Sequence, residues 1–401
     1  MQQNNWRVGN LFGIPLFLDP SWFFVVLFVT VVNALDFLPR FGSISWVAGF
    51  VMALLLFGSV LLHELGHSLV ALRQGIKVNS ITLFLFGGVA AIDRESSTPL
   101  GAFGVAIAGP MVSLGLFALF AVAAQFLPSG TLLRFLATDL GRINLVLAVF
   151  NMIPGLPLDG GQVLKALVWQ ITGDRFKGVR WAATSGKFLG GLAIAFGFSL
   201  LLFRGSFSAL WIALIGLFIY RNADSYDKLT VLQQALLQIT AADAMTRDFR
   251  VVDAHMSLRQ FAETYVLSDM QKPVPYYASA DGRYRGLVPI EDLQIVERSQ
   301  WDSQQLMSIA RPLTEIPTLP EKASLGEVIS YLEEKQLSFL TILSPAETVS
   351  GVIDRGDIVR SIASKLSLPI SEAEIKRIKQ EGTYPPGFQL PAIAKSSMAK
   401  E

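Results

Sequence analysis

The residues best suited to chemistry in this sequence are His63, Glu64 and His67, which form the pattern His-Glu-x-x-His. Residues four apart on an α-helix lie on one face, so both imidazoles can reach a single metal ion. Glu64 directly follows the first histidine, where its carboxylate can take a proton from a water molecule at that ion. The pattern therefore predicts a helical metal site with its own base, and it indicates hydrolysis.

A catalytic zinc usually takes three protein ligands and one water. The chain has no cysteine and only one further histidine, His255, which lies in the polar second half and is interpreted as a surface residue. The third ligand is therefore expected to be a carboxylate. Asp159 is the best candidate, because the prolines and glycines of 154–161 break an apolar segment around it. Such breaks occur at membrane depth where the backbone lines a cavity or is buried in protein.

Two further residues bear on this site. A lone carboxylate at the centre of a bilayer costs about 2.5–3.5 kcal/mol, and a structural zinc contributes on the order of 10 kcal/mol, which offsets that cost. Without a metal, the available counter-ion for Asp159 is Lys165, one to two helical turns further on. Asn151, two turns before Asp159, can donate its amide to a developing oxyanion. Alternatively, its side chain forms hydrogen bonds with free backbone groups at a helix end or in a loop.

These residues must be positioned by membrane-spanning helices. The chain has 401 residues, of which 52% are hydrophobic and 16% charged, against about 25% charged in soluble proteins. The run from residue 46 to residue 62 contains no charge and is long enough to cross a bilayer. The pattern predicts about six spans, near residues 22–38, 44–72, 100–127, 132–153, 188–203 and 207–220.

The basic residues between these segments predict their orientation. Residues 1–10 lack the pattern of a cleaved signal, so the first apolar segment is expected to be a retained span. The basic residues are more numerous on the side of the N-terminus than on the other, which carries Arg40, Arg134, Arg142 and Arg204. The N-terminus and the whole second half are therefore expected to be cytoplasmic, in a multi-pass membrane protein embedded in the lipid bilayer.

The segment 80–92 lies between the second and third expected spans. It is rich in β-branched and aromatic residues and contains Gly87 and Gly88, which indicates a strand or hairpin. A re-entrant or surface loop is the alternative interpretation. As a strand, it could hold a substrate peptide in an extended form by strand addition.

After residue 220 the composition becomes that of a soluble protein. We expect a linker helix over 223–239 and two similar units of about 60 residues over 240–300 and 301–366. Each unit closes with glycine, five residues and aspartate, at Asp292 and Asp357. The charged segment 367–401 is predicted to be disordered. The net charge of +1 gives no indication of nucleic-acid binding.

About residues 7–220 resemble the site-2 proteases, which are zinc intramembrane metalloproteases, so residues 1–222 are expected to form such a domain. The resemblance rests on His63 to His67 and on the second motif, an asparagine followed by a proline-flanked Asp-Gly, from Asn151 to Gly160. Gly87-Gly88 is similar to a glycine step in the family's short sheet, and Gly109-Pro110 to a glycine-proline on the next span. The resemblance implies one zinc per chain held by His63, His67 and Asp159, with Glu64 as base, Asn151 as an aid to the transition state and Gly87 and Gly88 at the substrate.

The second half resembles a tandem pair of CBS domains. Asp292 and Asp357 match the closing acid that meets a ribose in that family, which implies an adenine-nucleotide site. The position of the usual phosphate-binding hydroxyl is taken by Pro289 and Asp354, and neither residue can serve a phosphate. A structural or dimerising pair is the alternative. Because CBS pairs often dimerise, a homodimer is a further expectation.

The expected fold is thus a polytopic α-helical membrane protein with a short β-sheet insert, followed by α/β tandem CBS domains. The expected function is that of a zinc-dependent endopeptidase that cleaves transmembrane segments of membrane-anchored substrates, with regulation through the cytoplasmic CBS domains. Two alternatives remain. A CBS-regulated transporter or channel predicts inverted repeats, which the sequence does not display. A catalytically inactive membrane scaffold is distinguished only by an activity assay.

Overall fold

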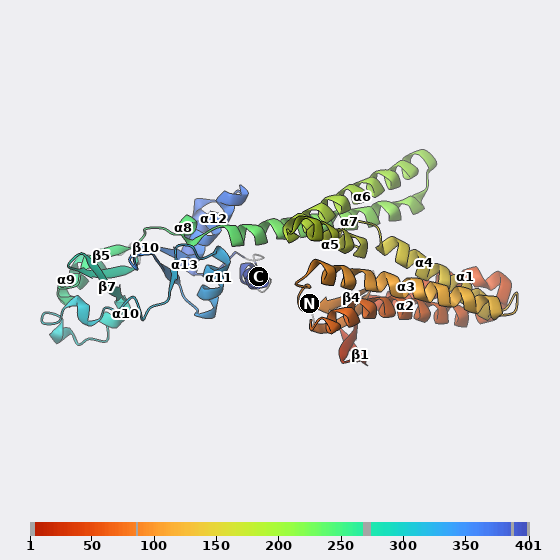
Figure 1. Cartoon of the computed structure of the whole chain (residues 1–401), viewed down its shortest axis with the longest axis horizontal. Coiled ribbons are helices and arrows are strands. Elements are labelled where there is room, and N and C mark those ends of the chain that lie inside the picture. Colours follow the sequence, from red (N-terminus) through yellow and green to blue (C-terminus); the bar gives the residue numbers. More distant parts are fainter. Residues whose placement is uncertain (1–4, 86, 268–273, 386–388, 399–401) are drawn as a thin grey trace. The chain divides into compact units, whose positions relative to one another are not determined.

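The computed structural model describes residues 5–85, 87–267, 274–385 and 389–398. These residues form two compact units, Met1–Thr230 and Val231–Glu401. The first unit is mostly helical and carries a small sheet, and the second contains two small sheets with short helices (Figure 1). Each unit is described by itself.

The first unit is built on long helices with well-defined ends. Asp19 caps the first of them by accepting a hydrogen bond from the backbone N–H of Ser21. Thr98 and Asp174 cap two others in the same way, and Gly173 and Gly205 end helices in the left-handed conformation. The helices are α1 (Pro20–Phe41), α2 (Ser45–Arg73), α3 (Pro99–Phe126), α4 (Leu132–Asn151), α5 (Asp159–Thr172), α6 (Arg175–Arg204) and α7 (Leu210–Gln238), with 3-10 turns at Gly42–Ile44 and Phe207–Ala209.

A helix lies at each of the six expected spans. Among the described residues, three segments are long and apolar enough to cross a membrane, Pro20–Arg73, Pro99–Phe126 and Arg175–Arg204. The first of these contains both α1 and α2. The helices at the fourth and sixth expected spans are more polar, since α4 carries several charged residues and α7 runs on past residue 220 into the segment expected as a linker.

Small residues let these helices approach closely. A Cβ atom at Gly49 of α2 would lie 2.5 Å from the carbonyl oxygen of Thr30 in α1. Gly190 of α6 and Gly216 of α7 face each other in the same way, each with a Cβ position 2.7 Å from the other's carbonyl oxygen. In a bilayer, where apolar burial gives no preference for protein over lipid, such close packing holds helices together.

The sheet of the first unit has the order β1-β2-β3-β4. Its strands are β1 (Trp6–Leu11), β2 (Ile14–Leu18), β3 (Val78–Phe84) and β4 (Gly87–Ile92). β3 and β4 pair antiparallel, which confirms the expected strand or hairpin within 80–92. β2 pairs parallel with β3 and brings the N-terminal hairpin into the sheet, which the sequence had not indicated. β4 is therefore an edge strand, and it packs on α2.

The second unit repeats one topology. The strands β5 (Arg250–Asp253), β6 (Tyr276–Ala280) and β7 (Arg283–Val288) form one sheet, in which β5 and β6 are parallel and β6 and β7 antiparallel. The strands β8 (Thr318–Pro320), β9 (Phe339–Leu343) and β10 (Val349–Asp354) repeat this arrangement. The internal repeat expected from the sequence is thereby confirmed as a structural one.

The helices of this unit cover the two sheets. They are α8 (Ala241–Ala244), α9 (Leu258–Phe261), α10 (Ile290–Leu293), α11 (Leu325–Glu334), α12 (Arg355–Leu366), α13 (Glu372–Glu381) and α14 (Leu390–Met398), with short turns at Ala262–Val266, Arg298–Gln300 and Leu306–Ser308. Residues 367–401, expected to be disordered, thus contain two helices within the part of the chain that the structure describes. Their apolar side chains explain the difference, because Ile378 and Leu390 are buried in the core around α11 and α12.

Candidate metal centre

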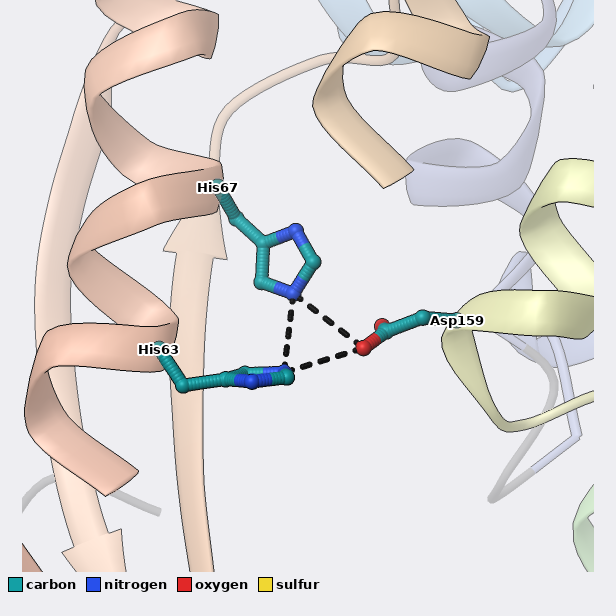
Figure 2. A group of neighbouring side chains, drawn as sticks. All are labelled: His63, His67 and Asp159. Atoms are coloured by element: carbon teal, nitrogen blue, oxygen red, sulfur yellow. Dashed lines mark hydrogen bonds and ion pairs between the residues drawn. The ribbon is translucent and has the colours of Figure 1, made fainter. Parts of the chain in front are cut away.

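Two histidines and one aspartate converge on a single point in the first unit (Figure 2). Nε2 of His63 lies 3.0 Å from Oδ2 of Asp159, and Nε2 of His67 lies 3.3 Å from the same oxygen. The two Nε2 atoms are 3.3 Å apart. Zinc bonds of about 2.0–2.2 Å in a tetrahedron place the donor atoms about 3.3–3.6 Å from one another. Two of the three distances lie at the lower end of this range and the third is 0.3 Å shorter, so the three atoms come close to one face of a zinc tetrahedron. The fourth position would be left for water or a substrate atom.

Helix α3 fixes the orientation of both histidine rings. Nδ1 of His63 lies 2.9 Å from Oγ of Ser113, and Nδ1 of His67 lies 2.7 Å from the carbonyl oxygen of Val105. When Nε2 binds a metal, Nδ1 carries the proton and donates it to such a partner. The carbonyl of Val105 can only accept, so it holds His67 in the tautomer that leaves Nε2 free to bind a metal. The hydroxyl of Ser113 can accept the corresponding proton from His63.

Gly109 of α3 lies directly against the donor atoms. A Cβ atom at this position would be 2.2 Å from Nε2 of His67 and 2.6 Å from Nε2 of His63. Any larger residue would displace one or both rings. Gly66 on α2 permits the same close approach from the other side, since its Cβ would lie 2.9 Å from the carbonyl oxygen of Ala108. The backbone of α3 therefore forms one wall of the site.

The break between α4 and α5 sets the position of Asp159. The chain between the two helices docks on α6, where the backbone N–H of Leu156 donates to the carbonyl oxygen of Ala182 over 3.1 Å. Gly160 and Gly161 allow the loop to fold back on the first turn of α5. A Cβ at Gly160 would lie 2.3 Å from the carbonyl oxygen of Met152. Asp159 is therefore the first residue of α5 and faces the histidines (Figure 2).

Glu64 is half-buried and packs against strand β4. A Cβ at Gly88 would lie 2.6 Å from Cγ of Glu64, and the backbone of Ala90 hydrogen-bonds to its side chain. The structure thus brings the predicted base and the glycine pair Gly87 and Gly88 together beside the metal ligands. Asn151 ends α4 and is half-buried, and no side-chain hydrogen bond of it is found among the described residues. Its role stays a prediction.

Several residues that hold the site together were missed from the sequence. Besides Ser113, which is fully buried, Asn144 of α4 is fully buried and donates from Nδ2 to Oγ of Ser59 over 3.0 Å. Ser59 lies one turn before His63 on α2, so this bond ties α4 to the metal helix. A polar residue within an otherwise apolar helix is a usable signal for such contacts.

The carboxylates expected at a nucleotide each have a basic partner within the second unit. Asp292 receives two hydrogen bonds from Arg311, of 2.8 and 2.7 Å, and Asp357 lies 2.6 Å from Nζ of Lys379. Burial alone would lower the pKa of Lys379, but the adjacent Asp357 and Asp354 raise it above its usual range. A nucleotide at either carboxylate stays a prediction. His255 is exposed, in agreement with its interpretation as a surface residue.

Comparison with known proteins agrees with this geometry. The model of peptidase family M50 matches residues 51–140 and 129–188, and that of the CBS domain matches residues 308–364. A Synechocystis protein, sll0528, which bears the provisional name of a zinc metalloprotease, is 41% identical over 363 residues, covering 90% of this chain and 96% of that protein. Rip3 of Mycobacterium tuberculosis, provisionally named in the same way, is 33% identical, covering 80% of this chain and 82% of that protein.

Among solved structures, the site-2 protease of Methanocaldococcus jannaschii is 32% identical, with a TM-score of 0.39, and the match covers 56% of this chain and 95% of that one. Both curated relatives bear the provisional name of a zinc metalloprotease, and the donor set found here suits zinc. The alignment with the Synechocystis protein covers 90% of this chain. The chain is therefore a member of peptidase family M50, the site-2 protease family of zinc metalloproteases.

Proposed function

We propose that this protein hydrolyses peptide bonds in membrane-spanning segments of other proteins. The observation that carries the proposal is the position of the donor triangle, in which His63 and His67 are buried among apolar helices and Asp159 is half-buried. Beside it lies β4, which is at the edge of its sheet among the described residues. A soluble protease would present such a site to bulk water. Here α2, which carries both histidines, belongs to a segment long and apolar enough to span a bilayer.

Each residue of the site has a proposed role in peptide-bond hydrolysis. When bound, a zinc ion acts as a Lewis acid that polarises a carbonyl and activates water. Glu64, which packs against β4, is the proposed base that takes a proton from the attacking water and delivers it to the leaving amine. Ser113 and the carbonyl of Val105 keep the two imidazoles oriented while charge develops. Asn151, at the end of α4, is the proposed amide donor to the oxyanion.

The edge of β4 is the proposed docking site for the substrate. A peptide bond in a helix is poorly exposed, because its backbone groups are hydrogen-bonded within the helix. A substrate segment must therefore unwind before cleavage, and strand addition to β4 would satisfy its freed backbone groups. Gly88 lacks a side chain that would displace Glu64, since a Cβ there would lie 2.6 Å from Cγ of Glu64. The proposed substrates are accordingly membrane-anchored proteins.

The proposed topology has six spans with both the N-terminus and the second unit in the cytoplasm. It is supported by the helices found at all six expected segments and by the distribution of basic residues. We further propose that the CBS unit regulates access to the site, through an adenine nucleotide or through pairing of two chains. A tandem repeat of two similar sheets is the feature that supports this regulatory role.

The first experiment separates zinc binding from catalysis with Glu64→Gln. The glutamine keeps the shape of the side chain but cannot accept a proton, so zinc content should stay near one ion per chain. Cleavage of a membrane-spanning test substrate in proteoliposomes should fall by about 10²–10⁴-fold, the usual contribution of a general base. Undiminished cleavage by a zinc-loaded variant would refute the role of Glu64. Absence of cleavage by the wild-type chain across substrates would favour an inactive scaffold.

The second experiment compares variants of the proposed ligands with a variant of the exposed histidine in the second unit. His63→Ala removes one donor and should abolish stoichiometric zinc binding, and Asp159→Ala should act in the same way. His255→Ala removes an exposed histidine of the second unit and should leave zinc content unchanged. Metal analysis of the purified proteins gives the result directly. Retention of a full zinc equivalent by the Asp159 variant would place the third ligand elsewhere.

A further inference from the structure

A cluster of three charged side chains joins distant parts of the first unit outside the metal site. Oε2 of Glu95 lies 3.4 Å from Nζ of Lys165 and 2.9 Å from Nη2 of Arg175. The Arg175 Nε atom also donates to the same oxygen over 2.9 Å. The side chain of Lys165 is only 5% exposed. A buried ammonium group is retained only where it is paired, so this contact is a built feature of the fold.

Each partner comes from an element that positions part of the metal site. Glu95 lies in the connection between β4 and α3. Strand β4 packs against Glu64, and α3 orients both histidines through Ser113 and the backbone of Val105. Glu95 is thus the junction of the two elements that support the histidine side of the site.

The two cations belong to the opposite side of the site. Lys165 lies on α5, the helix that begins with Asp159, and Arg175 is the first residue of α6, on which the loop before Asp159 docks. At 1.5 Å per residue, the backbone of Lys165 is about 9 Å along the helix axis from that of Asp159. A fixed point at Lys165 therefore restrains both the rotation and the axial position of α5.

Close packing leaves Lys165 little freedom to move. A Cβ atom at Gly178 of α6 would lie 2.5 Å from the carbonyl oxygen of Lys165 and 3.3 Å from its Cγ atom. The stem of the lysine thus lies against the backbone of α6, and its ammonium group reaches Glu95. Since the stem is confined in this way, a displacement of the Glu95 connection is transmitted to α5.

We propose that Glu95 is a positioning residue for the metal site, which sets the distance between the histidine pair and Asp159 through Lys165 and Arg175. The inference rests on the proposed function only in taking these three ligands as the zinc site. It assigns Glu95 no contact with substrate or metal. Its effect is to hold two supports of the site, β4–α3 and α5–α6, in one arrangement.

The test measures zinc affinity by chelator competition in the purified full-length protein in detergent, together with the melting temperature of the zinc-free form. Glu95→Gln removes the shared negative charge, and Lys165→Met removes the cation while keeping an unbranched apolar stem. Both variants should bind zinc about tenfold more weakly, the lower end of the range for residues that support a ligand from outside. The zinc-free melting temperature of Lys165→Met should stay near that of the wild type, because no unpaired charge is left buried.

A matched control is Asp139→Asn, which removes a carboxylate from the exposed Arg142 pair on α4. This variant should bind zinc like the wild type. Unchanged zinc affinity in both Glu95→Gln and Lys165→Met would overturn the proposal. Loss of affinity that follows a lowered zinc-free melting temperature in both variants would also overturn it, because the cluster would then support the fold in general. The readout needs no substrate, so failure of the proposed proteolysis leaves the result interpretable.

Discussion

Replacement of Gly109 by alanine tests the arrangement of α3 against the metal ligands most directly. The new Cβ atom would lie 2.2 Å from Nε2 of His67, whereas ordinary contacts begin at 3.4 Å. To restore an ordinary contact, the His67 ring must move by about 1.2 Å (3.4 − 2.2 Å). Metal–ligand bond lengths in proteins tolerate a deviation of only about 0.2 Å. A misplacement of about 1 Å at a catalytic group can lower a rate by about 100-fold.

We therefore expect Gly109→Ala to weaken zinc binding by about 10–100-fold and to lower cleavage by about 100-fold at limiting zinc. Affinity is measured by chelator competition in detergent, and cleavage is measured on a membrane-spanning test substrate in proteoliposomes. Both measurements are made on the same preparations. A lowered affinity with intact helical circular dichroism would place the effect at the ligands and not in the fold.

The control is Gly115→Ala on the same helix, where an added Cβ meets no atom within 4 Å. Alanine is favoured over glycine within a helix by about 1 kcal/mol, so this variant should be at least as stable as the wild type. It should bind zinc normally. If Gly109→Ala also binds zinc within twofold of the wild type and cleaves at the same rate, the backbone of α3 does not line the site and the reasoning fails.

Two further predictions concern single buried hydroxyl groups. Ser113→Ala removes the acceptor of the Nδ1 proton of His63 and should weaken zinc binding about tenfold, whereas Ser113→Thr should retain most of the affinity; chelator competition distinguishes them. Tyr277→Phe leaves the Thr341 hydroxyl without its 2.7 Å partner and should destabilise the second unit by about 1–3 kcal/mol at pH 8, measured by urea unfolding of the full-length chain. Burial raises the pKa of Tyr277 to about 12, against about 10 when unfolded, so the unfolded chain loses this proton first. The free energy of unfolding of the wild type should fall as pH rises from about 10 to 12, so its difference from that of the phenylalanine variant should become smaller. A difference that stays constant over this pH range would contradict the raised pKa of Tyr277.

The candidate metal ligands could be predicted from the sequence because their chemistry restricts both residue type and spacing. The i,i+4 histidines can share one ion only on a helix, and the break around Asp159 marks the point where an apolar segment leaves helical geometry. The support from α3 could not be predicted in the same way. Nearly every residue of α3 is apolar or small, so hydropathy does not distinguish the face toward the histidines from the face toward lipid. The contacts of Gly109 and Ser113 depend on that face.

The prediction of disorder after residue 366 was wrong, because it relied on the content of charged residues and not on the spacing of the apolar ones. The many charged residues of this segment suggested disorder, yet Ile375 and Ile378 are three residues apart and both are buried on one face of α13. That spacing was present in the sequence and is typical of an amphipathic helix. A count of charges alone cannot separate a disordered tail from a short helix whose other face is packed.

The helix α13 also explains the departure of the second CBS unit from the usual closing motif. Asp354 stands where a phosphate-binding hydroxyl is common, and a carboxylate there is unfavourable for a phosphate. In the structure this carboxylate lies 3.1 Å from Nζ of Lys379, which also lies 2.6 Å from Asp357. Gly356 makes room for the lysine, since a Cβ there would lie 2.4 Å from its Cγ atom. Asp354 and α13 are therefore coupled, because a hydroxyl at position 354 would leave Lys379 with one carboxylate fewer.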